Sequence, residues 1–456
     1  MRPTGQMRIR QVFRTGVVVL ALLVTSSTIP VNAQMPSQQQ GVPQPSVPSP
    51  GKELTLEEAI AIALQRQPQI LAKFGAVIAA QARVEQALAP LLPSSSISWT
   101  ATRSESLSST TRLPSLSTSG TLQISLSQKL FDFGKNFAII DSKKADTEAS
   151  KADLELTKDT IILSVKTFYF NLLYAKRQVI VFQEALDRAE LNLRSAKGFF
   201  EVGTRPKSDV TRAEVDVANA RVALIQARNA VRTARVALNI LLVLEVDAPT
   251  EVKDILTYEP FPVDPKQLAQ EALKNRPEYT KVKAQEASAE ATVREKFRQF
   301  FPDLDASGSY GGTGTESGTA SSSVFPLGET WSLGLTFSWK WFDGLNNVAK
   351  YREAKANLES AQATTKSQEL QIRQDVEQAY IGLVEAEERI GAAQKGVESA
   401  QENFRLAQGR FDAGVGTIIE LTDAQFALTQ AQSTEALALH DFRNNIATLE
   451  RALGRR

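Results

Sequence analysis

The sequence predicts a mainly α-helical protein that also carries a small membrane-type β-structure, built from one structural unit that occurs twice. Three patterns in the 456-residue chain predict this fold class. A heptad seam of apolar residues runs through a long helical hairpin, the same seam returns 211 residues later, and two short segments in each half alternate apolar and polar side chains. The repeated unit is a helix, a β-hairpin and a long helical hairpin, and such duplication is strong structural information.

The first helical hairpin is predicted over residues 161–241, with its turn at residues 200–206. Apolar residues recur at alternating spacings of four and three along both arms, which is the period of a coiled coil. Gly203 and Pro206 interrupt that period between the arms. The inbound seam consists of Ile161, Val165, Phe168, Leu172, Ala175, Val179, Phe182, Leu186, Ala189, Leu193, Ala196 and Phe200, and its counterpart in the second half runs from Ile372 to Phe411.

Composition excludes several classes of function. The chain has 52 basic and 51 acidic side chains, so it has no basic surplus to neutralise the phosphates of a nucleic acid. It has no cysteine, which excludes disulfides, thiolate metal sites and cysteine nucleophiles. The single histidine, His440, argues against a histidine-based catalytic or zinc centre. We find no pair of nucleophile and base and no phosphate-binding glycine loop, so the sequence predicts a protein without enzymatic activity, cofactor or metal.

The order of these patterns sets the expected domain boundaries. Residues 1–33 are typical of a secretory signal peptide, with four arginines, a short apolar core and a small-residue cleavage motif at Val31-Asn32-Ala33. A membrane-spanning helix is the alternative, but it needs about 20 apolar residues and this run is shorter. The predicted parts are a Pro/Gln/Ser-rich leader (34–52), a first repeat (53–245, strands at about 94–103 and 121–130, helical hairpin 135–245), an irregular connector (246–264) and a second repeat (265–456, strands at about 303–312 and 331–341, helical hairpin 345–454).

The four predicted strands are apolar on one face and rich in Ser, Thr or Gly on the other, which is the pattern of a transmembrane β-barrel. A half-buried sheet of a soluble protein is the alternative, because it shows the same alternation. The export signal and the tryptophans of the fourth strand favour the membrane. Residues 103–120 and 311–329 are predicted to be loops between strands. The residues expected to face lipid are Ile97, Trp99, Leu122, Ile124, Leu126, Trp331, Leu333, Leu335, Phe337 and Trp339.

Four strands cannot close a barrel, and in hydrocarbon each unpaired backbone group at an open edge is costly. Other copies of the chain must therefore complete the cylinder. Two copies would supply eight strands, which leave an interior filled by side chains, and three would supply twelve, which leave an open lumen. We therefore expect a homotrimer with cyclic symmetry, in which a twelve-stranded β-barrel is continued by a long α-helical barrel.

Over residues 54–454 the chain resembles the TolC-type outer-membrane efflux proteins, the outer membrane factors. The duplicated halves, the strand ends Leu130-Phe131-Asp132 and Trp341-Phe342-Asp343, and the two turns carry the resemblance. The resemblance implies a passive exit duct of a tripartite efflux or type I secretion system. It also implies an outer-membrane location in a Gram-negative-type bacterium, with contact to outer-membrane lipid, a periplasmic adaptor and an inner-membrane transporter as partners, and a body that extends into the periplasm.

By position in the family's motifs, Glu420 and Asp423 match two acidic residues that ring the periplasmic entrance, and Asp209 matches a turn aspartate that helps to hold it closed. In a trimer, Glu420 and Asp423 would place six carboxylates around the opening, where they repel one another and attract cations. The alternative is that they only cap a helix. The residues that match the adaptor-docking turns are Val202, Gly203, Thr204, Ala413, Gly414 and Val415.

At two positions the chain departs from the family pattern. Gly416 stands where relatives carry an arginine, and Phe411 stands where they carry a tyrosine. The contacts that close the entrance must therefore differ, and Arg205 and Lys207 of the other turn are candidates to replace them.

Two other classes of protein also contain long helical hairpins. A periplasmic adaptor would need a β-rich module between the arms, where this chain has only a short turn. A structural coiled-coil protein of the envelope would leave the paired amphipathic strands unexplained. The sequence does not identify the cargo of the expected duct, because similar ducts carry different molecules.

Overall fold

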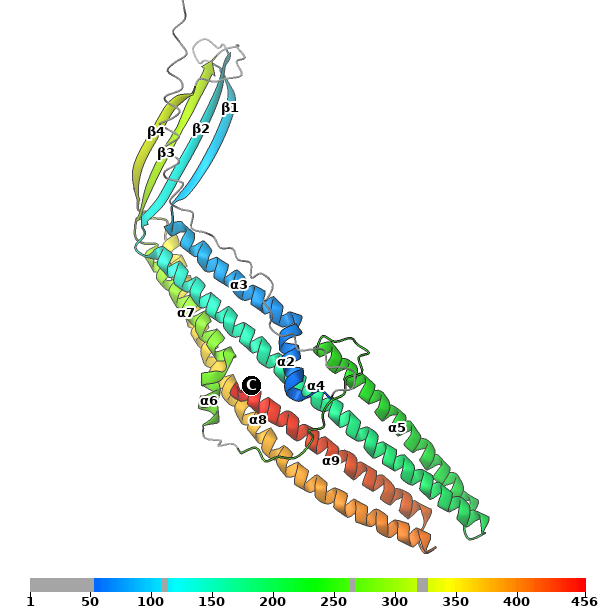
Figure 1. Ribbon diagram of the computed structural model, residues 1–456. Helices are drawn as coiled ribbons and strands as arrows, with labels where there is room; N and C mark the ends of the chain where they lie inside the picture. Colours follow the sequence, from blue (N-terminus) through cyan, green and yellow to red (C-terminus); the bar gives the residue numbers. More distant parts are fainter. Residues whose placement is uncertain (1–52, 108–113, 263–266, 318–326) are drawn as a thin grey trace, which may run out of the picture. The chain divides into compact units, whose positions relative to one another are not determined.

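A computed structural model describes residues 53–107, 114–262, 267–317 and 327–456 (Figure 1). The expected signal peptide (1–33) and leader (34–52) lie outside the described residues. The first half contains α2 (Leu56–Arg66), α3 (Pro68–Leu88), the short 3-10 helix η1 (Ala89–Leu91), β1 (Ser94–Leu107), β2 (Pro114–Phe131), α4 (Lys135–Glu201) and α5 (Lys207–Leu241). The second half contains α6 (Leu268–Asn275), α7 (Pro277–Arg298), β3 (Asp303–Ser317), β4 (Gly328–Ser338), α8 (Asn346–Asp412) and α9 (Ile418–Leu453) in the same order.

Short polar and proline signals define where the helices begin. Thr55 and Glu58 form a capping box at the start of α2, and Pro68 occupies the first turn of α3, where its missing N–H is not needed. The aspartate that ends each strand pair has the same role in both repeats. Asp132 accepts the backbone N–H of Asn136 at 2.8 Å, and Asp343 accepts that of Asn347 at 2.9 Å, so each aspartate satisfies free amides at the start of a long helix.

The four strands form one antiparallel sheet in the order β1-β2-β3-β4, so β1 and β4 are its edges (Figure 1). The predicted loops at 103–120 and 311–329 are wrong over much of their length. β1 continues to Leu107, β2 already begins at Pro114, β3 continues to Ser317 and β4 begins at Gly328. These extensions consist mostly of Ser, Thr and Gly, which pair through the backbone but lack the apolar alternation by which strands are found in a sequence.

The fourth strand is shorter than expected, because β4 ends at Ser338 and not near residue 341. Trp339 is therefore not a strand residue. Its indole N–H donates to the carbonyl of Phe300 at 3.0 Å, which ties the end of β4 to the segment that follows α7. Trp339 continues the alternating pattern of the strand in the sequence, but its hydrogen bond to Phe300 is made beyond the end of β4.

Helix α4 is central to the helical part, where it packs against α5, α9, α3 and α7 (Figure 1). Its seam against α5 includes the buried residues Val165, Leu172 and Leu186. A second face of α4, with Tyr169 and Leu173, is also buried. In the second repeat the seam is buried between α8 and α9 from Ile372 to Ala393. Among the described residues, no helix combines the length and the apolar character needed to cross a membrane.

The described connector residues 246–262 contain no helix or strand, only a single β-bridge between Val252 and Leu54. The Tyr169 hydroxyl lies 2.9 Å from the carbonyl of Leu54 and 2.8 Å from that of Lys253, so one buried side chain holds the connector and the N-terminal segment against α4. Burial raises the pKa of Tyr169 well above its ordinary value, and the side chain remains a hydroxyl donor.

Candidate functional site at the helical turns and the sheet face

Both helical turns have the same backbone geometry. In the first, the N–H of Thr204 donates to the carbonyl of Phe199 at 2.9 Å, and in the second the N–H of Val415 donates to that of Arg410 at 3.0 Å. Gly203 and Gly414 have φ values of 74° and 77°, a left-handed conformation that L-residues adopt at a cost. Their sequence positions are therefore explained by the helix ends alone. The neighbouring side chains face solvent: Val202 and Val415 are 72% and 71% exposed, and Thr204 and Ala413 are exposed as well.

Arg205 joins the two turns. Its guanidinium lies 4.1 Å from the ring centroid of Phe411 and donates to the carbonyl of Gly416 at 2.8 Å and to that of Phe411 at 3.2 Å. It also forms an ion pair with Asp209 at 3.5 Å, and its side chain is only 12% exposed. One largely buried guanidinium therefore makes a cation–π contact, two charged hydrogen bonds and an ion pair. Lys207 is exposed and has no ion pair among the described residues.

The backbone explains why position 416 holds a glycine. A Cβ atom there would lie 3.0 Å from the carbonyl carbon of Arg410 and from the backbone nitrogen of Phe411, so a side chain would displace the turn. The cation at this place comes instead from Arg205 of the other turn, and it stacks on Phe411, which has no hydroxyl to offer. Of the two candidate cations, Arg205 contacts Phe411 and Gly416, and Lys207 makes no such contact among the described residues.

The three acidic residues singled out from the sequence are not brought into one cluster. Asp209 is half-buried against Arg205 in the first turn. Glu420 and Asp423 are both exposed on α9, three residues apart, which places them on one side of the helix. Glu420 pairs with Arg410 at 3.2 Å, whereas Asp423 has no ion pair among the described residues.

The helix-capping alternative holds in part for Glu420, which lies in the first turn of α9, where a carboxylate stabilises the helix N-terminus, and Asp423 lies beyond that turn. The cap of α9 is Thr417, whose hydroxyl accepts the N–H of Glu420 at 3.2 Å, and neither carboxylate makes such a bond. Sequence reasoning missed Arg410 as the partner of Glu420. Its place one residue before Phe411, on the last turn of α8, is the signal that could have identified it.

The apolar strand residues share one face of the sheet. Residues directly opposite in paired strands point to the same side. Ile97 pairs with Ile124, Ile124 with Tyr310, and Tyr310 with Trp331, which forms an apolar row across all four strands. The side chains of this face are largely exposed on the single chain, up to 82% for Leu333. The other face carries polar rows such as Ser96, Ser125, Ser309 and Ser332.

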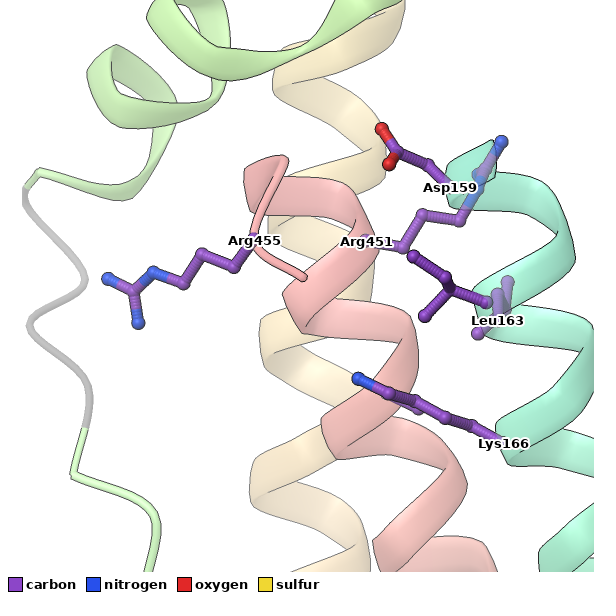
Figure 2. A pocket seen from close by; sticks show the side chains of 7 residues that line it. Asp159, Leu163, Lys166, Arg451 and Arg455 are labelled. Atoms are coloured by element: carbon purple, nitrogen blue, oxygen red, sulfur yellow. The ribbon is translucent and has the colours of Figure 1, made fainter. Parts of the chain in front are cut away.

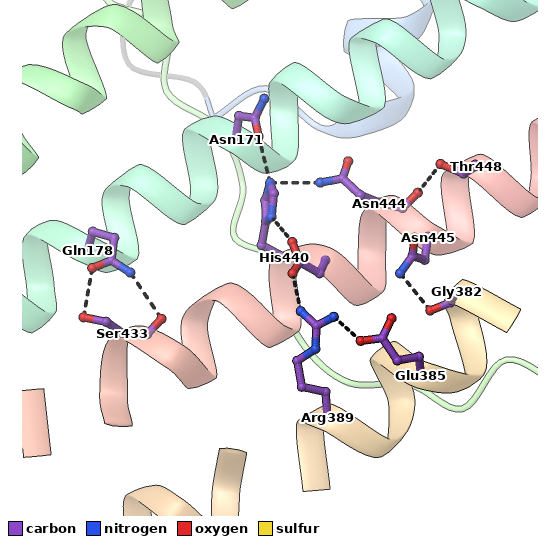
Figure 3. A network of polar contacts seen from close by, with 11 residues as sticks. Asn171, Gln178, Gly382, Glu385, Arg389, Ser433, His440, Asn444, Asn445 and Thr448 are labelled. Carbon is purple, nitrogen blue, oxygen red and sulfur yellow. Dashed lines mark hydrogen bonds and ion pairs between the residues drawn. The ribbon is translucent and has the colours of Figure 1, made fainter. Parts of the chain in front are cut away.

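Polar contacts join the two helical hairpins above the turns, along α4 and α9 (Figure 3). Gln178 and Ser433 make two hydrogen bonds to each other. His440 is 13% exposed, with Nδ1 3.0 Å from Asp441 and Nε2 2.7 Å from Asn171, and Asp441 in turn pairs with Arg389 of α8 at 2.8 Å. His440 is therefore a member of an interhelical network. Buried polar groups at this contact make its register specific.

A small cavity of about 10 Å³ lies between α4 and α9 and has room for about one water molecule (Figure 2). Its charged lining residues pair with neighbours: Lys166 contacts Glu450 at 2.6 Å, and Asp159 accepts from Arg456 at 2.8 Å. Burial raises the pKa of Asp159 above its ordinary value. The cavity carries no arrangement of nucleophile and base, and its ion pairs fasten helices together.

Comparison with known proteins matches this architecture. Residues 59–242 and 268–455, one segment in each repeat, match the family described as "Outer membrane efflux protein". The chain is 26% identical over 379 residues to nodulation protein T of Rhizobium leguminosarum bv. trifolii, an alignment covering 82% of this chain and 80% of the relative. It is 26% identical over 386 residues to outer membrane protein TolC of Escherichia coli (strain K12), covering 82% and 77%.

Solved structures share the fold. The outer-membrane channel OprN superimposes with a TM-score of 0.77 at 22% identity, covering 88% of this chain and 90% of that one. The outer membrane protein VceC of Vibrio cholerae superimposes with a TM-score of 0.77 at 20% identity, covering 88% and 96%. The predicted fold class and the predicted family are both confirmed. With both repeats matched and the channel fold reproduced, this chain belongs to the outer membrane efflux protein family.

Proposed function

We propose that this protein is the outer-membrane exit duct of a tripartite efflux or type I secretion system, a homotrimer that opens when a periplasmic adaptor and an inner-membrane transporter engage it. One observation carries the proposal: a four-stranded sheet with one exposed apolar face and two unpaired edges continues into long helical hairpins. Such a sheet is stable in lipid only when neighbours pair with its edges.

The arrangement of elements supports ring closure. The sheet ends in β1 on one side and β4 on the other, and the lower helices follow the order α5, α4, α9, α8, since α4 contacts α5 and α9, and α9 contacts α8. One flank of the chain therefore carries β1 and the other carries β4 in the sheet, and the outer helices of the lower part are α5 on one side and α8 on the other. A head-to-tail contact between different flanks generates a closed ring when the rotation fits, and three copies supply twelve strands.

In this duct the turns form the periplasmic end. Glu420 and Asp423 line the entrance, Asp209 takes part in closing it through Arg205, and the exposed residues of the two turns dock the adaptor. The apolar sheet face contacts outer-membrane lipid. The chain acts as a passive conduit, and its membership of the outer membrane efflux protein family supports this part of the proposal.

Purified full-length mature protein reconstituted in a planar lipid bilayer tests the proposal. We expect stepwise single-channel conductance and heat-sensitive migration of a trimer on denaturing gels. Recovery from the envelope as a water-soluble monomer without detergent, with no conductance, would contradict it. The same result would favour an adaptor or a structural envelope protein.

A further inference from the structure

Helix α9 exposes an aromatic ring close to the turn. Phe426 is 70% exposed, the highest value for an aromatic side chain on any described helix. A single exposed apolar residue is common on protein surfaces and has no meaning by itself. The groups that surround Phe426 on the helix therefore decide whether it belongs to a site.

Two sides of α9 are covered by its own chain in this stretch. On the side of α4, the amide of Gln425 donates to the carbonyl of Ala185 at 3.0 Å. On the side of α8, Leu421 is buried in a cluster with Phe411. At about 100° per residue, the exposed residues between 418 and 430 all fall on the side that remains. They are Ile419, Glu420, Asp423, Phe426, Ala427 and Gln430.

Asp423 is the free charge on this side. It precedes Phe426 by three residues, so the two side chains are neighbours on the helix surface. Within the described part of the chain its carboxylate has no ion pair and no hydrogen bond, whereas Glu420 pairs with Arg410 at 3.2 Å. Ile419, four residues before Asp423, is 50% exposed. We call Ile419, Asp423 and Phe426 the α9 stripe.

The α9 stripe combines the two groups that recognise an organic cation with apolar substituents. A free carboxylate attracts the positive charge, and the face of an aromatic ring attracts the cation and packs against its substituents. A hydrated metal ion would use only Asp423, because its water shell cannot pack against Phe426. A neutral apolar molecule would cover Asp423 without giving its carboxylate a partner, which is costly. The chemistry therefore favours a lipophilic cation over both.

We propose that the α9 stripe is a binding site for lipophilic organic cations just inside the periplasmic entrance. The proposal rests on the proposed trimeric duct, in which Glu420 and Asp423 line that entrance, and adds a ligand site within it. Phe426 lies about 4.5 Å further along α9 than Asp423, because each residue adds about 1.5 Å. Three copies therefore place three phenyl rings next to three free carboxylates.

Block of the single-channel current tests the site. Tetraphenylphosphonium added on the side of the turns should reduce the conductance of the reconstituted protein. Phe426→Ala should raise the concentration needed for half block about tenfold, because it removes the aromatic contact. Phe426→Tyr keeps the ring and should keep the block. Leu437→Ala, which truncates another exposed apolar side chain of α9, is the matched control and should leave the block unchanged.

Two further probes separate the aromatic contact from charge and from apolar packing alone. Asp423→Asn should weaken block by tetraphenylphosphonium and by Mg²⁺, whereas Phe426→Ala should weaken only the first, because Mg²⁺ keeps its water shell. Triphenylphosphine oxide, a neutral molecule of similar shape, should not block at the same concentration.

Three results would overturn the site and leave the duct intact: a conducting protein that tetraphenylphosphonium does not block, a block that Phe426→Ala leaves unchanged, or equal block by the neutral molecule. Migration of each variant as a trimer on gels checks its assembly. Absence of any conductance in the unaltered protein would refute the proposed duct and this site with it.

Discussion

Replacing Arg205 by alanine should loosen the contact between the two turns more than any other single change at this end of the molecule. The guanidinium is 12% exposed and contacts the Phe411 ring, two carbonyl oxygens and Asp209 at once. Truncation removes all four contacts; the carbonyl of Phe411 still accepts the backbone N–H of Gly414, whereas the carbonyl of Gly416 loses the Arg205 donor. It also leaves Asp209 half-buried without a counter-ion.

The magnitude follows from those contacts. A hydrogen bond to a charged group contributes about 1.5 kcal/mol, and a partly buried cation–π contact contributes about 1 kcal/mol. Since these terms are not independent, we expect a loss of about 3 kcal/mol in the coupling of the turns, which shifts the ratio of separated to joined turns by about a hundredfold.

Basal conductance of the reconstituted trimer is the assay, and it should rise strongly in Arg205→Ala. Lys207→Ala is the matched control: it removes a neighbouring cation that is exposed, and conductance should stay as in the unaltered protein. Arg205→Lys should lie between, because it keeps the charge and loses the planar stacking. An intact Arg205→Ala trimer with unchanged basal conductance would refute the role assigned to this side chain.

Three further predictions concern other parts of the molecule. Val202→Asp combined with Val415→Asp should abolish efflux in cells while the trimer persists on gels, because both side chains are exposed and neither backbone is strained. Bulky residues at Gly203 or Gly414 would be a poorer test, since they would also distort the turns. Retained efflux in the double variant would argue against adaptor docking at the turns. Hydrogen bonds from Lys281 at 2.6 Å and Lys73 at 2.7 Å lower the pKa of Asp153. Its contribution of about 1 kcal/mol should therefore be complete above the ordinary aspartate pKa of about 4 and decline as pH falls from there through the lowered folded-state pKa. Thermal unfolding of Asp153→Asn should differ from that of the unaltered protein at pH 7, and the difference should shrink steadily as pH falls below about 4; a difference that does not change with pH would contradict this. Tyr169→Phe removes the donor to Leu54 and Lys253 and should cost about 1–3 kcal/mol in unfolding free energy, measured by denaturant titration; an unchanged midpoint would contradict the assigned role of the hydroxyl.

Local signals were enough to predict most of the architecture. The heptad seam from Ile161 to Ala196 identified the arms of the hairpin, because an apolar repeat of 3.5 residues keeps one side of a helix facing a partner helix. The strand ends were missed where Ser, Thr and Gly dominate, since backbone pairing leaves no apolar period in the sequence. Trp339 was misplaced for the opposite reason: it continued the pattern, but its indole bonds to Phe300 beyond the strand.

The candidate site was predictable as a location and not as a set of contacts. Gly203 and Gly414 marked both turns, because a left-handed residue after a helix is most often glycine. The sequence made Arg205 and Lys207 equal candidates to contact the second turn, and only the structure showed that Arg205 reaches Phe411 and Gly416. The pairing of Arg410 with Glu420 was not predicted either. Arg205 is more than 200 residues from Phe411 and Gly416 in the sequence. Arg410 and Glu420 lie on the two sides of one turn, and the path of the backbone in that turn sets the distance between them.

By itself, the sequence determined the duplication, the two seams, the alternating strands and the family, because each depends on the spacing of side chains along the chain. The tertiary structure decided which side chains the charged groups meet: Arg205 stacks on Phe411, and Lys281 and Lys73 both bind Asp153. Periodicity specifies which face of a helix is apolar, and an ion pair depends on how two distant helices are placed side by side.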